Sequence, residues 1–204
     1  MDKENKNYKP LTILVDMDDC IENLSEAWIN FLNNRYGTSI KPEDITEWSI
    51  EKAFPEIPAA DVYGVLREEA LWETVKPLPG AVKYLKKLID DGNQIYIVTA
   101  SHPDTVSAKM NKVLFRYFPF ISYENVVIAS KKQLIRGDFL IDDAPHNMGG
   151  SYKGLLFTAN HNRSITDDEL MGMNAVRVDN WKEVYELIHG YQVHSEKKSK
   201  GGIK

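Results

Sequence analysis

Short apolar runs, separated by stretches with helical periodicity, recur along most of the chain and constrain its fold more than any other feature. The runs are continuous rather than alternating in polarity, as expected of strands that are covered on both faces. They occupy residues 11–15, 94–98, 125–128, 138–141, 154–157 and 175–178. Between them, apolar residues recur at helical spacing, as in 81–91, 104–118 and 181–189. This alternation predicts a parallel α/β sheet with right-handed crossovers.

The interval between the first and second runs, nearly eighty residues, is too long for one crossover. Its last part, from Pro77 to Asp91, has the turn and helix of an ordinary crossover, which leaves residues 20–77 as an insertion. We therefore expect a Rossmann-like three-layer core, made of residues 1–19 and 78–204, with a small helical cap inserted after the first strand. Residues from about 194 to 204 are rich in Lys, Ser and Gly and predict a disordered tail.

The composition excludes several classes of function. Lys and Arg number 25 and Asp and Glu number 30, so the net charge is −5, and such a surface does not attract polymeric nucleic acid. No run approaches the roughly 18 apolar residues of a membrane span, and residues 1–10 lack the apolar segment of a signal peptide. Cys20 is the single cysteine, so no intramolecular disulfide can form, and we expect a reducing, cytoplasmic location.

Carboxylates follow two of the predicted strands at the point where each strand ends. Asp16 and Asp18 come after the first strand, and they project together because side chains at i and i+2 of an extended chain point the same way. Asp142 and Asp143 come after the fourth strand. Ligands bind at the carboxyl edge of an open parallel sheet, where oxygen ligands from two strands suit Mg²⁺. Taken alone, either pair is more often a solvated turn than a metal site.

A hydroxyl group and a cation are predicted at the same edge of the sheet. Thr99 ends the second strand, and the helix that follows it can turn its first amides toward an anion. Lys131 and Lys132 precede the fourth strand. Each feature alone is compatible with an ordinary cap or surface residue, but their combination with the two Asp pairs indicates a phosphate site.

Together these motifs resemble the four signature motifs of the haloacid dehalogenase (HAD) superfamily. Asp16-Met17-Asp18 is similar to the first motif, Thr99 to the second, Lys132 to the third and Asp142-Asp143 to the fourth. Within the superfamily, longer segments resemble the 5′(3′)-deoxyribonucleotidases, and they are residues 13–18, 77–82, 140–145, 156–162 and 181–182. The resemblance covers residues 11 to about 190.

The resemblance implies a Mg²⁺-dependent phosphatase that acts through an aspartyl-phosphate on a small phosphorylated substrate, a nucleoside monophosphate. Asp16 would be the nucleophile, and Asp18 would protonate the leaving oxygen and then activate water. Thr99 and Lys132 would hold the phosphoryl oxygens, with the neighbouring residues Ala100 and Ser101 beside them.

The same resemblance implies how a metal ion would be held. The Asp16 carboxylate, the backbone carbonyl of Asp18 and the Asp142 carboxylate would bind Mg²⁺, and Asp143 would act from behind them or through water. Lys132 is preferred to Lys131 because its ten-residue distance from Asp142 is the spacing of the family.

Several positions depart from the family pattern. Asp19 stands where glycine is usual, Ala100 where a serine is frequent, and Leu24 where an aromatic residue would stack on the base. Trp48 and Trp72 either supply replacement stacking or pack inside the cap. These departures leave the phosphatase chemistry intact and bear on substrate choice.

Two alternatives stay open beside a 5′(3′)-nucleotidase. One is a HAD phosphatase for another small phosphate ester, such as a sugar phosphate, and the other is a HAD-like binding protein without catalysis. A dehalogenase is disfavoured, since that chemistry does not use a second aspartate such as Asp18. The sequence also leaves the oligomeric state open, with a homodimer as one alternative.

Overall fold

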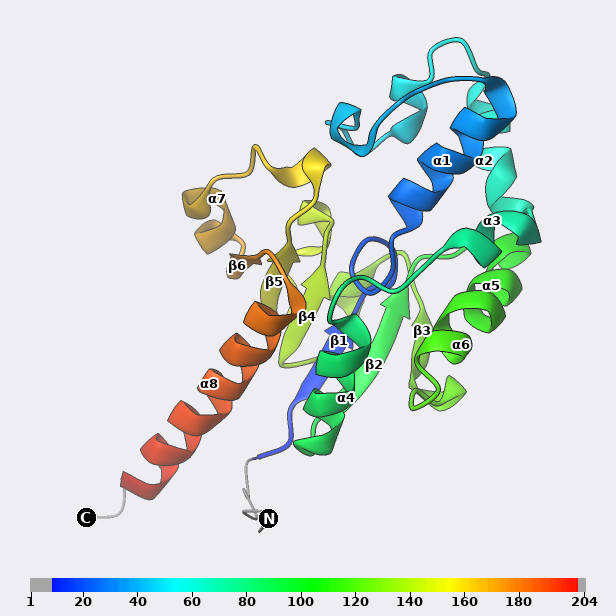
Figure 1. Cartoon of the computed structure of the whole chain (residues 1–204). Coiled ribbons are helices and arrows are strands. Elements are labelled where there is room, and N and C mark those ends of the chain that lie inside the picture. Colours follow the sequence, from blue (N-terminus) through cyan, green and yellow to red (C-terminus); the bar gives the residue numbers. More distant parts are fainter. Residues whose placement is uncertain (1–8, 202–204) are drawn as a thin grey trace.

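A six-stranded parallel sheet forms the centre of the molecule (Figure 1). The computed structural model describes residues 9–201, and side chains as far as residue 195. The strand order is β3-β2-β1-β4-β5-β6, and each neighbouring pair is parallel. The strands are β1 (Thr12–Val15), β2 (Gln94–Thr99), β3 (Val126–Ile128), β4 (Phe139–Asp142), β5 (Lys153–Phe157) and β6 (Ala175–Val178). The predicted parallel α/β sheet is therefore confirmed.

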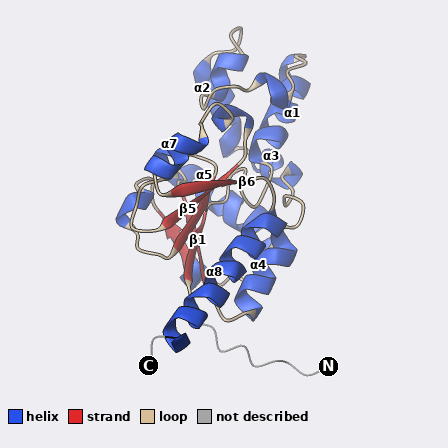
Figure 2. Ribbon diagram, turned by 90° about the vertical axis from the view of Figure 1, so that its left-hand side faces the viewer, coloured by secondary structure: helices blue, strands red, loops and turns tan. Residues whose placement is uncertain are grey.

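The two faces of the sheet are covered differently. The helices of one face are α4 (Ala81–Asp90), α5 (Pro103–Lys109), the π-helical turn η4 (Met110–Leu114), α6 (Phe115–Tyr117) and α8 (Trp181–Gly201). In Figure 2, α4 and α8 lie side by side on one side of the strands, with α7 (Asp167–Gly172) on the other. Leu14, Val98 and Leu140 point to this second face, where Tyr152 covers them from a loop. Both faces are buried, which explains why the strand sequences are apolar throughout.

The connections between the strands also contain short 3-10 turns. They are η5 (Tyr123–Asn125), η6 (Lys132–Leu134), η7 (Pro145–Asn147) and η8 (Asn160–Asn162). Three of these, η6, η7 and η8, belong to loops that carry residues of the site described below.

Short helices between β1 and β2 form a layer above the carboxyl ends of the strands (Figure 1). They are α1 (Leu24–Tyr36), η1 (Pro42–Asp44), η2 (Ile50–Ala53), α2 (Ala59–Gly64), η3 (Val65–Arg67) and α3 (Glu69–Thr74). Two chain segments run side by side where this layer joins the sheet, since Asn23 N–H donates to Lys76 O and Leu78 N–H donates to Ile21 O. Buried apolar side chains of the layer and of the sheet form one continuous cluster. We call residues 20–77 the cap, and its boundaries stay a prediction.

The start of α1 is stabilised by an aspartate that precedes it. Asn23 occupies the N-cap position but its side chain makes no capping hydrogen bond, because its Oδ1 accepts from Lys76 N–H at 2.8 Å. Asp19 Oδ1 accepts instead from Ser25 N–H at 3.0 Å. The helix ends at Gly37, whose φ of 68° is the left-handed conformation that glycine adopts without strain.

The last helix is longer than the sequence predicts. α8 runs from Trp181 to Gly201, so the backbone is helical through most of the stretch for which a disordered tail is expected. Residues 194–200 contain Glu and Lys but no Pro or Gly, and such a segment extends an existing helix at little cost. Residues 202–204 lie outside the described part. No helix among residues 9–201 has the length and apolar character of a membrane span.

Candidate active site

Residues from the first and fourth motifs meet because β1 and β4 are neighbours. Val15 pairs with Ile141 in the parallel register, and Asp16 N–H continues the pairing by donating to Ile141 O at 2.9 Å. Asp16 and Asp142, 126 positions apart in the sequence, therefore lie at the same edge of the sheet. Both carboxylates are buried. Burying two acids so close together is costly unless a cation compensates them.

Lys132 is that cation. Its Nζ lies 2.7 Å from Asp16 Oδ1 and 2.7 Å from Asp142 Oδ2, and the side chain is 2% exposed. Burial alone would lower the pKa of Lys132, but the two carboxylates raise it above its ordinary value, so the ammonium stays charged. The neighbouring Lys131 is exposed. Of the two lysines between which the sequence could not decide firmly, the geometry thus brings Lys132 to the site.

The two aspartates of the fourth motif face different surroundings. Asp142 is fully enclosed, and its oxygens accept from Lys132 Nζ, from Ala144 N–H at 2.9 Å and from Asn147 Nδ2 at 3.0 and 3.2 Å. Asp143 lines the cavity, and its Oδ1 meets no donor of the described chain. The sequence predicts Asp142 as the direct metal ligand with Asp143 behind it, and this assignment stays a prediction, but it is Asp143 that faces the cavity. Asp142 has no oxygen free of protein donors, whereas Asp143 does.

The side chains that face the cavity fit a hard divalent cation. Ligand atoms of Asp16, Cys20 and Asp143 lie within 4.8 Å of one another. Burial raises the pKa of Asp16 to about 7, with Lys132 opposing the shift and Asp142 adding to it. Burial likewise raises the pKa of Asp143 well above its usual range. A divalent cation between two such carboxyls would favour their ionised forms, and oxygen donors are the ligands that Mg²⁺ prefers.

A second buried lysine, Lys109, which the sequence did not lead us to predict, binds Asp18 and Thr99. Lys109, the last residue of α5, is 1% exposed. Its Nζ lies 2.7 Å from the carboxylate of Asp18 and 2.7 Å from Thr99 Oγ1. The signal was present in the sequence, because Lys109 falls on the same helical face as Val106 and Val113, where an apolar residue is expected.

Lys109 also controls the charge of Asp18. Burial would raise the pKa of Asp18, but the Lys109 ammonium, together with hydrogen bonds from Glu22 and Lys109, holds it below the ordinary value. The Asp18 side chain is 31% exposed, toward the cavity. It is thus a fixed carboxylate with access to a ligand.

The second motif lies beside Lys109. Thr99 is fully buried at the end of β2 and accepts a hydrogen bond from Lys109, which leaves its hydroxyl hydrogen free to donate. Ala100 lines the cavity. Ser101 does not line it, and its Oγ has no partner among the described residues.

A cavity of about 220 Å³ opens between the sheet edge and the cap. The core supplies Asp16, Asp18, Asp19, Ala100, Ser130, Lys132, Asp143, His146, Asn147 and His161, and the cap supplies Leu24, Ser25, Trp28, Ile45, Glu47, Trp48, Ile50 and Tyr63. The core wall is charged and the cap wall is largely apolar and aromatic. A ligand with an anionic end and an apolar end would match this division.

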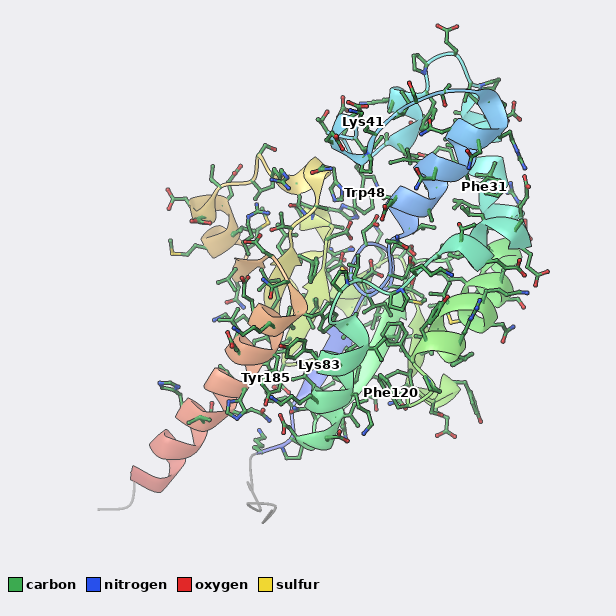
Figure 3. All side chains as sticks on the ribbon, viewed as in Figure 1. Phe31, Lys41, Trp48, Lys83, Phe120 and Tyr185 are labelled. Atoms are coloured by element: carbon green, nitrogen blue, oxygen red, sulfur yellow. The ribbon has the colours of Figure 1, made fainter. Side chains whose placement is uncertain are left out.

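Trp48 closes the cap side of the cavity. In Figure 3 it lies between the cap and the loops of the core, and its ring meets His146 and His161 edge-on at centroid distances of 5.0 and 4.9 Å. Burial lowers the pKa of His161, so its neutral form is favoured. Because 56% of Trp48 is exposed, its ring can contact a bound molecule.

The other two cap residues that the sequence predicts as substrate contacts, Leu24 and Trp72, lie in different surroundings. Leu24 is buried at the cavity wall and offers an apolar surface without a ring. Trp72 is not part of the wall. It is buried within the cap, where its Nε1 donates to Leu66 O at 2.8 Å. Of the two alternatives for Trp72, its position supports packing inside the cap.

Asp19 faces the cavity and the cap together. Its φ of 53° is unusual for a residue other than glycine, and both its oxygens accept hydrogen bonds from Ser25, one from N–H and one from the hydroxyl group. Burial raises the pKa of Asp19 to about 6, although the Ser25 hydrogen bonds oppose the shift. The aspartate that replaces the usual glycine is thus tied to the first cap helix.

Comparisons with known proteins identify the family of the chain. The profile of the family described as 5′ nucleotidase, deoxy (pyrimidine), cytosolic type C protein matches residues 9–195. A 5′(3′)-deoxyribonucleotidase of Bacillus subtilis (strain 168) is 33% identical over 176 residues, which cover 84% of this chain and 95% of the relative.

Solved structures agree on the fold. A haloacid dehalogenase-like hydrolase from Streptococcus pneumoniae superposes with a TM-score of 0.61 at 14% identity, covering 88% of this chain and 98% of the other. A HAD-hydrolase from Bacillus subtilis, solved bound to magnesium, has a TM-score of 0.54 at 14% identity, with coverage of 88% and 98%.

Proposed function

Since the chain belongs to the 5′ nucleotidase, deoxy (pyrimidine), cytosolic type C family and is a phosphatase of the HAD superfamily, we propose that it hydrolyses nucleoside 5′- or 3′-monophosphates with Mg²⁺ through an aspartyl-phosphate. One observation carries the proposal. Asp16 and Asp18 both line one cavity, and each has its own buried lysine at 2.7 Å. A cytosolic location, as the family description and the single cysteine suggest, is part of the proposal.

In the first half-reaction an Asp16 oxygen attacks phosphorus, and the ester bond to the leaving oxygen breaks. Asp18, carrying a proton when the substrate is bound, donates it to that oxygen. Thr99 holds Lys109 in place from behind the cavity wall, and Lys132 compensates negative charge beside the nucleophile. The carboxyl of Asp18 is accessible from the cavity for this step. Lys109 lowers its pKa in the free enzyme, and the negative charge of the bound phosphate would oppose that shift and favour the protonated form.

In the second half-reaction water attacks the phosphorus of the aspartyl-phosphate. Asp18 takes the proton of that water, inorganic phosphate leaves, and the Asp16 carboxylate is regenerated. Both half-reactions therefore use the same carboxyl in opposite protonation states.

The residues that would hold Mg²⁺ are Asp16, Asp143 and the backbone carbonyl of Asp18. Asp142 would instead anchor Lys132, since its oxygens are occupied by protein donors. The bound ion would offset the charge of the substrate phosphate and polarise its oxygens. Asp143, with its unpartnered oxygen at the cavity, is the residue that most supports this assignment.

The cap would recognise the nucleoside. The exposed ring of Trp48 offers a stacking surface for a base, and Leu24 adds apolar contact. No lysine or arginine is among the cap residues that line the cavity, so a second phosphate group would find no compensating charge there. This favours monophosphates over diphosphates.

A substrate panel tests the proposal. Phosphate release from dUMP, dTMP and the 3′-monophosphates is compared with release from glucose 6-phosphate and glycerol phosphate, each with Mg²⁺ and with EDTA. We expect the highest kcat/KM for nucleotides and loss of turnover with EDTA. Equal rates on sugar phosphates would favour the other phosphatase function. Mg²⁺ binding without turnover of any ester would favour a binding protein.

A further inference from the structure

Among the described cap residues that line the cavity, Glu47 is the one with a charged side chain. It directly precedes Trp48, whose ring is proposed to stack on a base. The Glu47 side chain is 57% exposed, and its Oε2 accepts a hydrogen bond from Lys52 Nζ. Lys52 is itself 59% exposed and does not line the cavity, and a surface ion pair of this kind contributes little to stability. Since two carboxylate oxygens offer about four acceptor sites, Glu47 keeps acceptors for a ligand.

Three side-chain donors of the same cap wall are already used within the protein. The Trp28 indole N–H donates to a carbonyl oxygen of the cap at 2.8 Å. The Ser25 hydroxyl donates to Asp19, and the Tyr63 hydroxyl donates to Glu51 at 2.5 Å. A ligand that turns acceptors toward this wall therefore meets few free side-chain donors, whereas a ligand that turns N–H donors toward it meets a carboxylate.

The base edge that matches a carboxylate is one with two neighbouring N–H donors. Guanine presents N1–H and the N2 amino group side by side, and the two oxygens of one carboxylate can accept from both at once. Hypoxanthine keeps N1–H but lacks the amino group. Adenine has an acceptor at N1, so a carboxylate that faces it meets a lone pair instead of a hydrogen. Guanine is thus the purine that this wall fits best.

We propose that Glu47 is a specificity-determining residue of the cap, which selects guanine nucleotides by accepting hydrogen bonds from N1–H and the N2 amino group of the base. The inference rests on the proposed function, in which a nucleoside monophosphate binds with its base against the cap. Trp48 contacts the face of the base, and the neighbouring Glu47 contacts its edge. Stacking tolerates every base, whereas a carboxylate distinguishes donors from acceptors, so the edge contact supplies the selectivity.

A purine series on the wild-type enzyme measures this selectivity. The bases of dGMP, dIMP and dAMP differ only in the donors and acceptors at one edge of the purine. We expect kcat/KM to fall in the order dGMP, dIMP, dAMP, with at least about fivefold between the first and the last, because a mismatched polar group at a binding site costs more than a lost contact. A smaller ratio, or another order, would overturn the proposal.

The variant Glu47→Gln tests the residue itself. A glutamine amide offers one donor beside one acceptor, the pattern that pairs with adenine. We expect kcat/KM to fall for dGMP and to rise for dAMP, so that their ratio drops at least about fivefold. Glycerol phosphate, which has no base, should be hydrolysed as by wild type. An unchanged dGMP to dAMP ratio would contradict the proposal.

The matched control is Glu56→Gln, because Glu56 is an exposed glutamate of the cap that does not line the cavity. It should keep the wild-type ratio of kcat/KM for dGMP and dAMP. Thermal unfolding of both variants establishes that they fold, as expected for substitutions of exposed side chains. An equal drop of the ratio in both variants would show that Glu47 has no special part in base selection.

Calorimetric binding of deoxyguanosine and deoxyadenosine tests base recognition without turnover, since neither nucleoside carries a phosphate. We expect wild type to bind deoxyguanosine at least about fivefold more tightly, and Glu47→Gln to lose this difference. If wild type hydrolyses no ester but shows the difference in binding, the proposed function fails while base selection by Glu47 stands. If wild type hydrolyses dGMP and dAMP equally well, the proposed function stands and base selection by Glu47 fails.

Discussion

The sheet edge and the cap line the same cavity, yet they are built in different ways. At the sheet edge, Asp16, Lys132 and Asp142 are buried, and Lys132 is bonded to each of the two aspartates at 2.7 Å. In the cap, Trp48 sits between the turns η1 and η2 with more than half of its side chain exposed. Neighbouring parallel strands hold side chains in one register, whereas single helical turns leave them less constrained. We therefore expect the core to perform the chemistry and the cap to select the substrate.

The largest expected effect falls on the core. Asp16→Asn removes the nucleophile and should lower kcat/KM for dUMP and for p-nitrophenyl phosphate alike by at least about 10³-fold. Phosphate release with Mg²⁺ measures this. The variant should still fold, because removing one of several crowded carboxylates relieves repulsion. Activity above one-tenth of wild type would assign the nucleophile elsewhere.

A second core substitution tests charge compensation. Lys132→Met leaves Asp16 and Asp142 buried without their cation and should reduce the free energy of unfolding by about 3–5 kcal/mol. Urea unfolding at pH 8 without metal measures it. Lys109→Met should reduce the free energy of unfolding by less, because its partner Asp18 is 31% exposed and water can compensate part of the lost charge. Equal losses of unfolding free energy in the two variants would show that Lys132 and Lys109 compensate buried negative charge to the same extent.

The cap substitution should change binding rather than turnover. Trp48→Ala should raise KM for nucleoside monophosphates about tenfold, since base–aromatic stacking contributes about 1–3 kcal/mol, and leave kcat nearly unchanged. Glycerol phosphate, which lacks a base, should show no change in KM. Trp72→Phe is the control, because Trp72 is buried in the cap and its replacement should alter stability but not KM. A fall in kcat for Trp48→Ala would mean that the cap also takes part in the chemistry.

The smallest expected effect lies where cap and core meet. Burial lowers the pKa of His161, so the unfolded chain binds more protons there as the pH falls through the ordinary value of about 6.5. His161 therefore contributes a loss of stability on acidification. His161→Gln removes that contribution, so between pH 7.5 and pH 5.5 wild type should lose more stability than the variant in urea unfolding. The difference should be below about 1.4 kcal/mol for each unit of pKa shift, and a difference of the opposite sign would contradict a buried neutral histidine.

The difference between the sheet edge and the cap also explains which parts of the molecule could be predicted from the sequence. Strands buried on both faces are recognisable as continuous apolar runs, and a parallel sheet brings their carboxyl ends together. Asp16, Asp18 and Thr99 follow from this rule, and Lys132 follows from the resemblance to the family through its ten-residue distance from Asp142. In the cap, short turns with little periodicity carry no comparable pattern, so Trp48 and Trp72 could not be told apart. Lys109 was missed since a lysine on an apolar helix face is usually a surface residue at a helix end.

The amino-acid sequence by itself determined the parallel sheet, the edge at which the site lies and the residue types gathered there, because these depend on local periodicity and on chain direction. Tertiary structure alone decided that Asp143 rather than Asp142 faces the cavity and that Lys109 bonds to Asp18. The physical reason is that successive residues at the end of a strand point in opposite directions. Which of them meets a ligand and which meets a buried partner depends on what packs against each face.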